Sequence, residues 1–479
     1  MRLTDTESLN ETWGQERNLM MLRVFVASAF VILKVAFSTE AMAVTNDCPG
    51  DVYVDGAALV VEPTGSDDTE NLQCAVDSAS RQALKAVRLE AGDYYIDQLL
   101  ISNFEGSIEG KSIGTTRLRL SRRQLDCPKE DFETIIAPIT VKGGDTVFRY
   151  MTIDASAGPC FRGDFWSILL YTQQSCSSRV AFGAVDRVRV IGDRSSGSVG
   201  ITAVSQPACA AIGNGALGTF RVNRVALESV GVGVRTSKVG VAQVDINFSD
   251  FTEVGTGIQI FNANQSTSIV SNRIEYNTGP TTGAPMGIFV DTTEAWAPEE
   301  NRTVIHQNAL AQGTFDDSSR AVVLSNSTIE ADHSAVITRN VFQLKSNSRS
   351  ANNGVVITDT DNVTIVDNRF LGSANYSIYV DSPTWFQNRR NTEGTVINRN
   401  DFTDIVPRTA ADIFLGGGTS LSLVGPQAAA IKDSGADNFI AESTAQADVQ
   451  SDVPDFSPSG DSSGAFDDGD SDALSGFEQ

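Results

Sequence analysis

One six-residue pattern recurs five times in the second half of this 479-residue chain. It has the form Ile-x-x-Asn-x-apolar, and successive copies lie 36, 32, 28 and 32 residues apart. Repeats of this length, with strand-like rather than helix-like patterning, are typical of solenoids, in which each repeat packs only against its neighbours. The asparagines of the five copies are Asn272, Asn308, Asn340, Asn368 and Asn400.

A second pattern lies between successive copies of the first. It is a short run of residues that favour β-strands, led by a small or turn-favouring residue. One repeat therefore holds at least two strands separated by turns, and stacked repeats would form parallel sheets along the long axis. The runs are Gly257-Ile-Gln-Ile, Gly287-Ile-Phe-Val, Ala321-Val-Val-Leu, Gly354-Val-Val-Ile, Ser377-Ile-Tyr-Val and Asp412-Ile-Phe-Leu.

With these two patterns the sequence resembles the right-handed parallel β-helix proteins of the pectate-lyase-like, or pectin-lyase-fold, superfamily. The resemblance covers roughly residues 52 to 425 and rests on strand patterns rather than on an active-site motif. It implies an all-β solenoid in which the asparagine at each bend points inward and bonds the next coil, so these asparagines are scaffold. The same phase predicts Asn223 and Ser249 at the ladder position of earlier coils.

The N-terminal segments are predicted to be a leader and a cap. Residues 21–43 combine a basic start, an apolar run and a small-x-small site at Ala41-Met42-Ala43, which is typical of a signal peptide. A membrane anchor is the alternative, although Lys34 interrupts the short apolar run. Residues 1–20 precede the leader and are interpreted as a non-translated or disordered extension. We expect the protein to be secreted, periplasmic or at the cell surface.

Residues 44–107 are predicted to form the N-terminal cap and first strands, followed by the β-helix proper over 108–425. In proteins with the resemblance noted above, a helix covers the open end of the solenoid, which would otherwise expose its core and unpaired strand edges. The sequence predicts such a helix after Gly65, with four apolar residues on one face. These residues are Leu72, Ala75, Val76 and Ala79.

Charge limits the partners that the chain can have. The formal net charge is −24 and the pI is about 4.4, which argues against nucleic acid or an anionic membrane as a partner. An acidic polysaccharide remains compatible, through a local basic patch or a bridging cation. Residues 433–479 contain 12 acidic residues and no Lys or Arg, so we expect a disordered acidic tail.

All six cysteines follow the predicted leader. An even number in an exported chain favours up to three disulfides, and six cysteines allow fifteen pairings, so the connectivity stays open. No C-x-x-C pair occurs, which makes a zinc cluster or a thioredoxin-like site a poor fit. The cysteines are Cys48, Cys74, Cys127, Cys160, Cys176 and Cys209.

The middle residue of each short strand run is predicted to face outward, because alternate residues of a strand point to opposite sides. Phe289 and Tyr379 in this row are candidates for stacking on sugar rings. The alternative is that a long loop or the C-terminal tail covers the row. The row is Gln259, Phe289, Val323, Val356, Tyr379 and Phe414.

Three carboxylates follow strands on different coils: Asp291, Asp359 and Asp381. Neighbouring coils stand about 4.8 Å apart, so carboxylates in matching phase could share a proton or hold Ca²⁺. Asp316 and Asp317 form a further candidate pair just before a strand. The alternative for all of them is that Asp favours the turn next to a strand.

Two loops that follow these strands carry a tryptophan each, Trp296 and Trp385. If shorter loops lie between them, the two indoles would form the walls of a trough. We expect this trough, together with Phe289 and Tyr379, to be the binding site for a polysaccharide.

Two functions remain open at this point. The resemblance favours a polysaccharide lyase or glycoside hydrolase that uses the carboxylates above. However, the Gly-His-Gly segment of polygalacturonases and the Asp-Pro-His-Asp segment of alginate epimerases are both absent. The alternative is a non-catalytic extracellular or cell-surface protein with a structural or adhesive role. No cofactor is required by either function, Ca²⁺ could assist binding, and the sequence does not specify an oligomeric state.

Overall fold

The computed structural model describes most of the chain between Asp47 and Ala441. The expected extension 1–20 and leader 21–43 lie outside the described residues, as does the chain after residue 441. The described segments are 47–48, 51–120, 137–157, 167–172, 182–193, 198–204, 217–237, 241–261, 266–276, 285–292, 301–313, 319–326, 333–345, 352–382, 392–407, 411–427 and 429–441.

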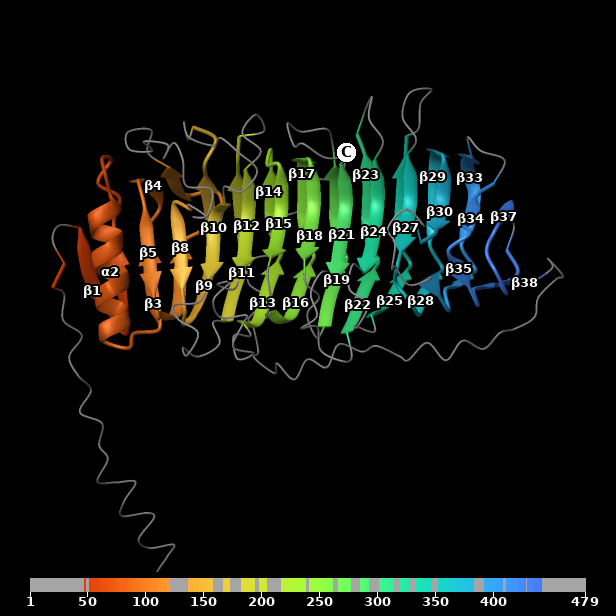
Figure 1. Ribbon diagram of the computed structural model, residues 1–479. Coiled ribbons are helices and arrows are strands. Elements are labelled where there is room, and N and C mark those ends of the chain that lie inside the picture. Colours follow the sequence, from red (N-terminus) through yellow and green to blue (C-terminus); the bar gives the residue numbers. More distant parts are fainter. Residues whose placement is uncertain are drawn as a thin grey trace, which may run out of the picture.

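The chain winds into a right-handed parallel β-helix, as the sequence predicts (Figure 1). Each full coil contributes one strand to a twelve-stranded sheet and two to a twenty-four-stranded sheet. Strands of neighbouring coils pair in parallel, whereas β1 and β2 at the N-terminal end pair antiparallel. The strands of the twelve-stranded sheet are β5 (Leu99–Ser102), β8 (Ile139–Lys142), β10 (Ser167–Thr172), β12 (Val199–Val204), β15 (Val232–Ser237), β18 (Thr256–Phe261), β21 (Met286–Thr292), β24 (Arg320–Asn326), β27 (Asn353–Thr358), β30 (Tyr376–Val380), β34 (Ile413–Leu415) and β37 (Ile431–Asp433).

The twenty-four-stranded sheet bends within each coil, and the repeated asparagines lie at that bend. Its strands are β1 (Val52–Asp55), β2 (Ala58–Val61), β3 (Ala86–Leu89), β4 (Gly92–Ile96), β6 (Glu105–Gly110), β7 (Thr116–Leu120), β9 (Asp145–Asp154), β11 (Phe182–Ile191), β13 (Leu217–Asn223), β14 (Ala226–Glu228), β16 (Val241–Asn247), β17 (Asp250–Val254), β19 (Ser266–Val270), β20 (Arg273–Tyr276), β22 (Asn301–His306), β23 (Ala309–Gln312), β25 (His333–Thr338), β26 (Val341–Leu344), β28 (Val363–Val366), β29 (Arg369–Ala374), β32 (Val396–Asn398), β33 (Asp401–Pro407), β36 (Leu423–Val424) and β38 (Phe439–Ile440). A two-stranded sheet joins β31 (Thr392–Glu393) to β35 (Thr419–Ser420).

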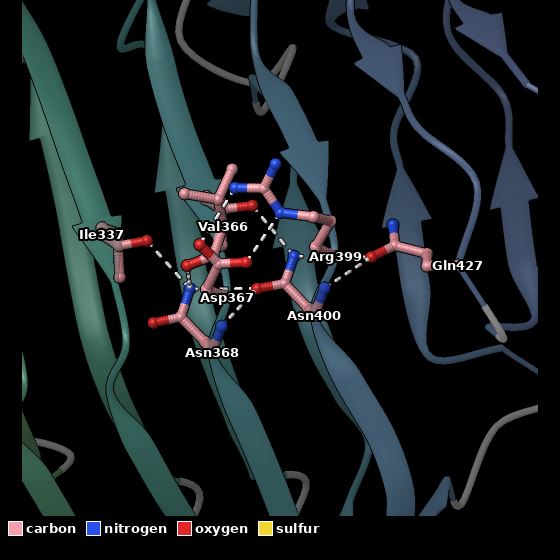
Figure 2. A network of polar contacts seen from close by, with 8 residues as sticks. Ile337, Val366, Asp367, Asn368, Arg399, Asn400 and Gln427 are labelled. Atoms are coloured by element: carbon pink, nitrogen blue, oxygen red, sulfur yellow. Dashed lines mark hydrogen bonds and ion pairs between the residues drawn. The ribbon is translucent and has the colours of Figure 1, made fainter. Parts of the chain in front are cut away.

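The asparagine ladder is present and buried. In each rung the side-chain oxygen of one asparagine accepts hydrogen bonds from the backbone N–H and the amide of the asparagine one coil earlier. For Asn308 these bonds to Asn340 Oδ1 measure 2.8 and 3.0 Å. Figure 2 shows the last rungs, where Asn368 bonds Asn400 and Asn400 bonds Gln427. The asparagines therefore satisfy bend amides that burial would otherwise leave unpaired.

The ladder begins earlier than its first asparagine. Ser249 occupies the predicted ladder position, since its N–H bonds Asn272 Oδ1 at 2.9 Å. The prediction for Asn223 is wrong, because the ladder position of that coil is Val225, whose N–H bonds Ser249 Oγ at 3.2 Å. Asn223 lies in register with Asn247, two residues before the ladder, and donates to Asp186 instead.

Inward-facing residues fill one hydrophobic cluster that runs from Val52 to Val424. Like side chains of neighbouring coils stack on one another inside it. The rings of Phe342 and Phe370 lie 4.9 Å apart, and those of Phe370 and Phe402 lie 5.1 Å apart. A change of register between coils would break this stacking, so the core and the asparagine ladder specify the same alignment.

The small residue that leads each strand of the twelve-stranded sheet lies where coils approach closely. A Cβ at Gly287 would lie 2.5 Å from the carbonyl oxygen of Ala321 and 2.5 Å from the Leu310 side chain. On β30 the corresponding Ser377 and the following Ile378 are both buried, so the alternation of side chains is interrupted there. The residue that precedes this small residue therefore points outward, on the same side of the sheet as the middle residue of the run.

The helix α2 (Thr69–Arg81) lies at the N-terminal end of the solenoid, beside β5 (Figure 1). Its four predicted apolar residues are all buried, which confirms the predicted capping face. A disulfide joins Cys48 to Cys74 of α2, so the segment before β1 is tied to the cap. The other four cysteines lie outside the described residues.

The solenoid extends past the predicted start of the acidic tail. The tail was expected from Asp433 onward, but β37 ends at Asp433 and β38 forms a further strand on β36. Side-chain bonds of Asn438 to Asp433 and Thr419 hold this last turn in place. Within the described segments, no helix has the length and apolar character needed to cross a membrane.

Candidate functional site

The predicted outward row of the twelve-stranded sheet exists as one register row. Gln259 pairs with Phe289, and the pairing continues coil by coil to Phe414. Lys432 of β37 extends the row by one more coil. The neighbours of Phe289, Ile288 and Val290, are fully buried, so the row itself faces away from the core.

Three aromatic side chains gather at the C-terminal end of this face and form what we call the aromatic cluster: Tyr376, Tyr379 and Phe414. The rings of Tyr379 and Phe414 are stacked with centroids 5.0 Å apart, and Tyr376 lies 5.1 Å from Phe414 and 5.8 Å from Tyr379. The Lys432 ammonium lies 5.4 Å from the centre of the Phe414 ring. Sequence reasoning missed Tyr376, because it assumed unbroken alternation through Ser377.

A second aromatic pair lies three coils earlier. The rings of Phe261 and Phe289 meet edge to face at 5.5 Å, and the Arg235 guanidinium lies 5.2 Å from the Phe261 ring centre. Between the two groups, Val323 and Val356 face outward but are only 7% and 5% exposed. The row is thus open at its two aromatic groups and covered between them.

Arg320 lies on the same face, in a parallel row that runs through Asn353 to Tyr376. Its side chain is half-buried, and burial lowers the pKa of its guanidinium. Among the described residues no carboxylate lies within ion-pair distance of it, whereas most arginines of the twenty-four-stranded sheet have such a partner. An interaction with the phenol of Tyr379 raises the same pKa by a smaller amount.

Asp381 follows the strand that carries Tyr379, and both of its carboxylate oxygens accept hydrogen bonds. Its Oδ2 accepts the hydroxyl proton of Tyr379 at 3.0 Å, and its Oδ1 accepts the N–H of Gly418 at 3.2 Å. A Cβ at Gly416 would overlap the Asp381 carboxyl group, so the turn needs glycine there. Burial, followed by the charge of Asp381, raises the pKa of Tyr379 to about 12.

The three predicted carboxylates do not form one group. Asp291 is in register with Thr358, the residue before Asp359, whereas Asp381 follows the strand after that. Three strand steps separate Asp291 from Asp381, which is about 14 Å along the axis at about 4.8 Å per step. Asp359 is one residue out of phase, 4% exposed, and bonded by Ser382. A proton or cation shared by all three does not fit this spacing.

Four predicted site residues lie outside the described residues: Asp316, Asp317, Trp296 and Trp385. The carboxylate pair and the tryptophan-walled trough therefore remain predictions. In the described segments, no group of three or more His, Cys, Asp or Glu side chains is placed to hold a metal ion.

Comparison with known proteins gives matches in structure only. No protein-family model matches the sequence, and no curated protein matches it. The A-module of the mannuronan C-5 epimerase AlgE6 of Azotobacter vinelandii is similar at 12% identity and a TM-score of 0.45, over 78% of this chain and 94% of that chain. The surface adhesin PfbA of Streptococcus pneumoniae is similar at 10% identity and 0.43, over 79% and 87%. The catalytic domain of a GH87 alpha-1,3-glucanase is similar at 10% and 0.43, over 84% and 71%.

Proposed function

We propose that the protein binds an acidic polysaccharide across the outward face of the twelve-stranded sheet. The observation that carries the proposal is the aromatic cluster beside Arg320, a half-buried cation with no carboxylate partner among the described residues. Aromatic rings of this kind stack on flat apolar faces of ligands, and a guanidinium binds a carboxylate through two parallel hydrogen bonds. The site thus offers both contacts that a uronic-acid chain needs.

Local charge supports an anionic rather than a neutral ligand. The chain as a whole carries −24, yet Arg235, Arg320 and Lys432 all lie along this one face. Arg320 is partly removed from water and has no carboxylate partner among the described residues, so binding of an anion would stabilise its charge. The two aromatic groups lie three strand steps apart with buried Val323 and Val356 between them, so the proposed contact is a short stretch of the chain at the aromatic cluster beside Arg320.

We further propose that the protein acts outside the cytoplasm. The Cys48–Cys74 disulfide supports an oxidising compartment, since such bonds persist mainly in exported proteins. The predicted leader over residues 21–43 agrees with export. Secretion, periplasmic retention and surface display all remain compatible with these two features.

Calorimetric titration with a glycan panel tests the proposal. We expect oligogalacturonate or another uronic-acid oligosaccharide to bind, and Tyr379→Ala to weaken binding by about tenfold, as expected for a lost stacking contact of 1–2 kcal/mol. Tyr53→Ala is the matched control, because Tyr53 is a 41% exposed tyrosine on β1. Absence of binding to every acidic glycan, or an equal loss in both variants, would contradict the proposal.

A second candidate function is processing of the bound chain, and the Tyr379–Asp381 hydrogen bond favours it. With a pKa of about 12 the phenol stays protonated at neutral pH, so Tyr379 could act as a proton donor and not as a base. Product analysis for unsaturated ends and for new reducing ends, with and without Ca²⁺, separates processing from binding. Retained binding without products would leave the adhesive or structural role.

A further inference from the structure

A second row of side chains lies at the same bend of each coil as the asparagine ladder, one residue before the ladder position. In all nine coils concerned, the residue at this position has a left-handed backbone although it is not glycine. We call it the bend row. Its members, with their φ angles, are Tyr150 (59°), Arg187 (51°), Arg224 (53°), Phe248 (53°), Ser271 (56°), Gln307 (55°), Arg339 (56°), Asp367 (56°) and Arg399 (51°).

The ladder makes the bend row rigid. The bend residues from Arg224 to Asp367 donate their N–H groups to carbonyls of the next coil, as Phe248 does to Val270 at 3.1 Å and Gln307 does to Thr338 at 3.1 Å. Because the following residue is turned inward, the side chain of the bend residue projects from the surface. A left-handed conformation is unfavourable for large side chains, so the fold holds these residues in place at a cost in local strain.

Four consecutive members of the bend row form a patch of two arginines between two aromatic rings. They are Tyr150, Arg187, Arg224 and Phe248, one from each of four coils in register. Arg187 donates to the Tyr150 hydroxyl at 2.8 Å and lies 5.3 Å from its ring centre. Phe248 is 60% exposed, which is unusual for a phenylalanine in a rigid turn.

The two arginines of this patch are not neutralised within the part of the chain that the structure describes. No carboxylate there lies within ion-pair distance of Arg187 or Arg224, and the adjacent Asp186 accepts a hydrogen bond from Asn223 at 2.7 Å. Elsewhere on the same sheet the pattern differs, since Arg399 is paired twice with Asp367, at 2.8 and 3.0 Å. The backbones of Arg187 and Arg224 lie one strand step apart, about 4.8 Å, so an anion bound beside them would be attracted by both positive charges.

We propose that this patch is a second ligand site, which binds a sugar that carries an oxyanion. Arg187 and Arg224 hold the sulfate or carboxylate group through paired N–H donors, and the exposed ring of Phe248 stacks on the adjoining sugar. Tyr150 fixes the orientation of Arg187 through the hydrogen bond above. The site lies on the twenty-four-stranded sheet and does not depend on the function proposed for the other face.

Fluorescence anisotropy with two labelled probes tests the site and distinguishes the anion. The probes are a heparin dodecasaccharide, which carries sulfate, and an oligogalacturonate of similar length, which carries carboxylate only. We expect at least one probe to bind, and Arg224→Gln to weaken that binding by about tenfold or more, as for a lost hydrogen bond to a charged group. Phe248→Ala should weaken the same probe severalfold.

Two variants serve as controls. Arg339→Gln removes an exposed arginine from the same bend position, but one whose row neighbours are Gln307 and Asp367, so binding should stay within twofold. Tyr379→Ala removes a contact of the other face, where an acidic glycan is also proposed to bind, so Arg224→Gln, Phe248→Ala and Arg339→Gln are each measured in a Tyr379→Ala background. Circular dichroism of each variant checks that the fold is retained.

The proposal is overturned if neither probe binds, if Arg224→Gln binds like the wild type, or if Arg339→Gln is as damaging as Arg224→Gln. It is also overturned if poly-glutamate of matched charge binds equally well and Phe248→Ala has no effect, because the patch would then recognise charge alone.

Discussion

The hydroxyl of Tyr379 donates to Asp381 Oδ2 at 3.0 Å, on the face where Tyr379 also stacks on Phe414. This one contact joins the aromatic cluster to the turn at Gly416 and orients the tyrosine ring. The sugar-binding surface we propose therefore depends on a half-buried carboxylate that orients Tyr379.

Substitution of the turn glycine tests this dependence. Gly416→Ala introduces a Cβ that would overlap the Asp381 carboxyl group, so we expect a loss of about 1–3 kcal/mol in unfolding free energy and weaker glycan binding. Gly417→Ala is the control, because the nearest atom to its Cβ would be Ser434 O at 3.9 Å. Denaturant unfolding measures both, and equal effects of the two substitutions would argue against a close contact at Asp381.

Alkaline pH should weaken the contribution of Tyr379 to stability. Its pKa in the folded protein, about 12, lies above the ordinary value of 10.0, so folding favours the protonated phenol. That contribution is fully present below about pH 10 and is lost as the pH rises through 12. Thermal unfolding of the wild type and Tyr379→Phe should differ most below pH 10 and converge towards pH 12. A constant gap across this window would be inconsistent with the raised pKa.

The asparagine ladder should contribute measurably to stability. Asn340→Leu removes the acceptor of the Asn308 backbone N–H and leaves that buried donor unpaired, at an expected cost of about 1–3 kcal/mol. Gln307→Leu changes an exposed side chain one residue before the ladder and should cost less than about 0.5 kcal/mol. An unchanged melting temperature in Asn340→Leu would show that the ladder is not needed for register.

Removal of the cap disulfide should also destabilise the fold. The Cys48–Cys74 bond closes a loop with a sequence separation of 26, for which chain-entropy arguments give about 3 kcal/mol. The double variant Cys48→Ser/Cys74→Ser avoids disturbing the other four cysteines. We expect a lower melting temperature and faster hydrogen exchange in α2 than in β27. Uniform exchange throughout the solenoid would mean that the disulfide does not act on the cap.

Much of the fold could be predicted from residue spacing, because a polar residue that recurs at a buried bend can satisfy its hydrogen bonds in only a few arrangements of the coils. The phase of Asn272 and its successors led directly to the register row that contains Phe289 and Tyr379. Asn223 was misplaced because a single asparagine near a strand end does not distinguish the ladder from the strand before it.

The site was less predictable than the fold. Tyr376 was missed because strand alternation fails where Ser377 and Ile378 both turn inward, and this depends on the close approach of coils. Asp291 and Asp381 do share a row, but phase alone does not give the number of coils between them. The absence of a described carboxylate beside Arg320 depends on long-range packing that sequence separation does not reveal.

The most direct test of the central claim compares an acidic and a neutral oligosaccharide of the same length on wild type and Arg320→Gln. We predict that the wild type prefers the uronic-acid chain, and that Arg320→Gln loses about tenfold in affinity for it while affinity for the neutral chain stays the same. Equal affinity of the wild type for both chains, or an unchanged preference in Arg320→Gln, would contradict recognition of an acidic glycan by this face.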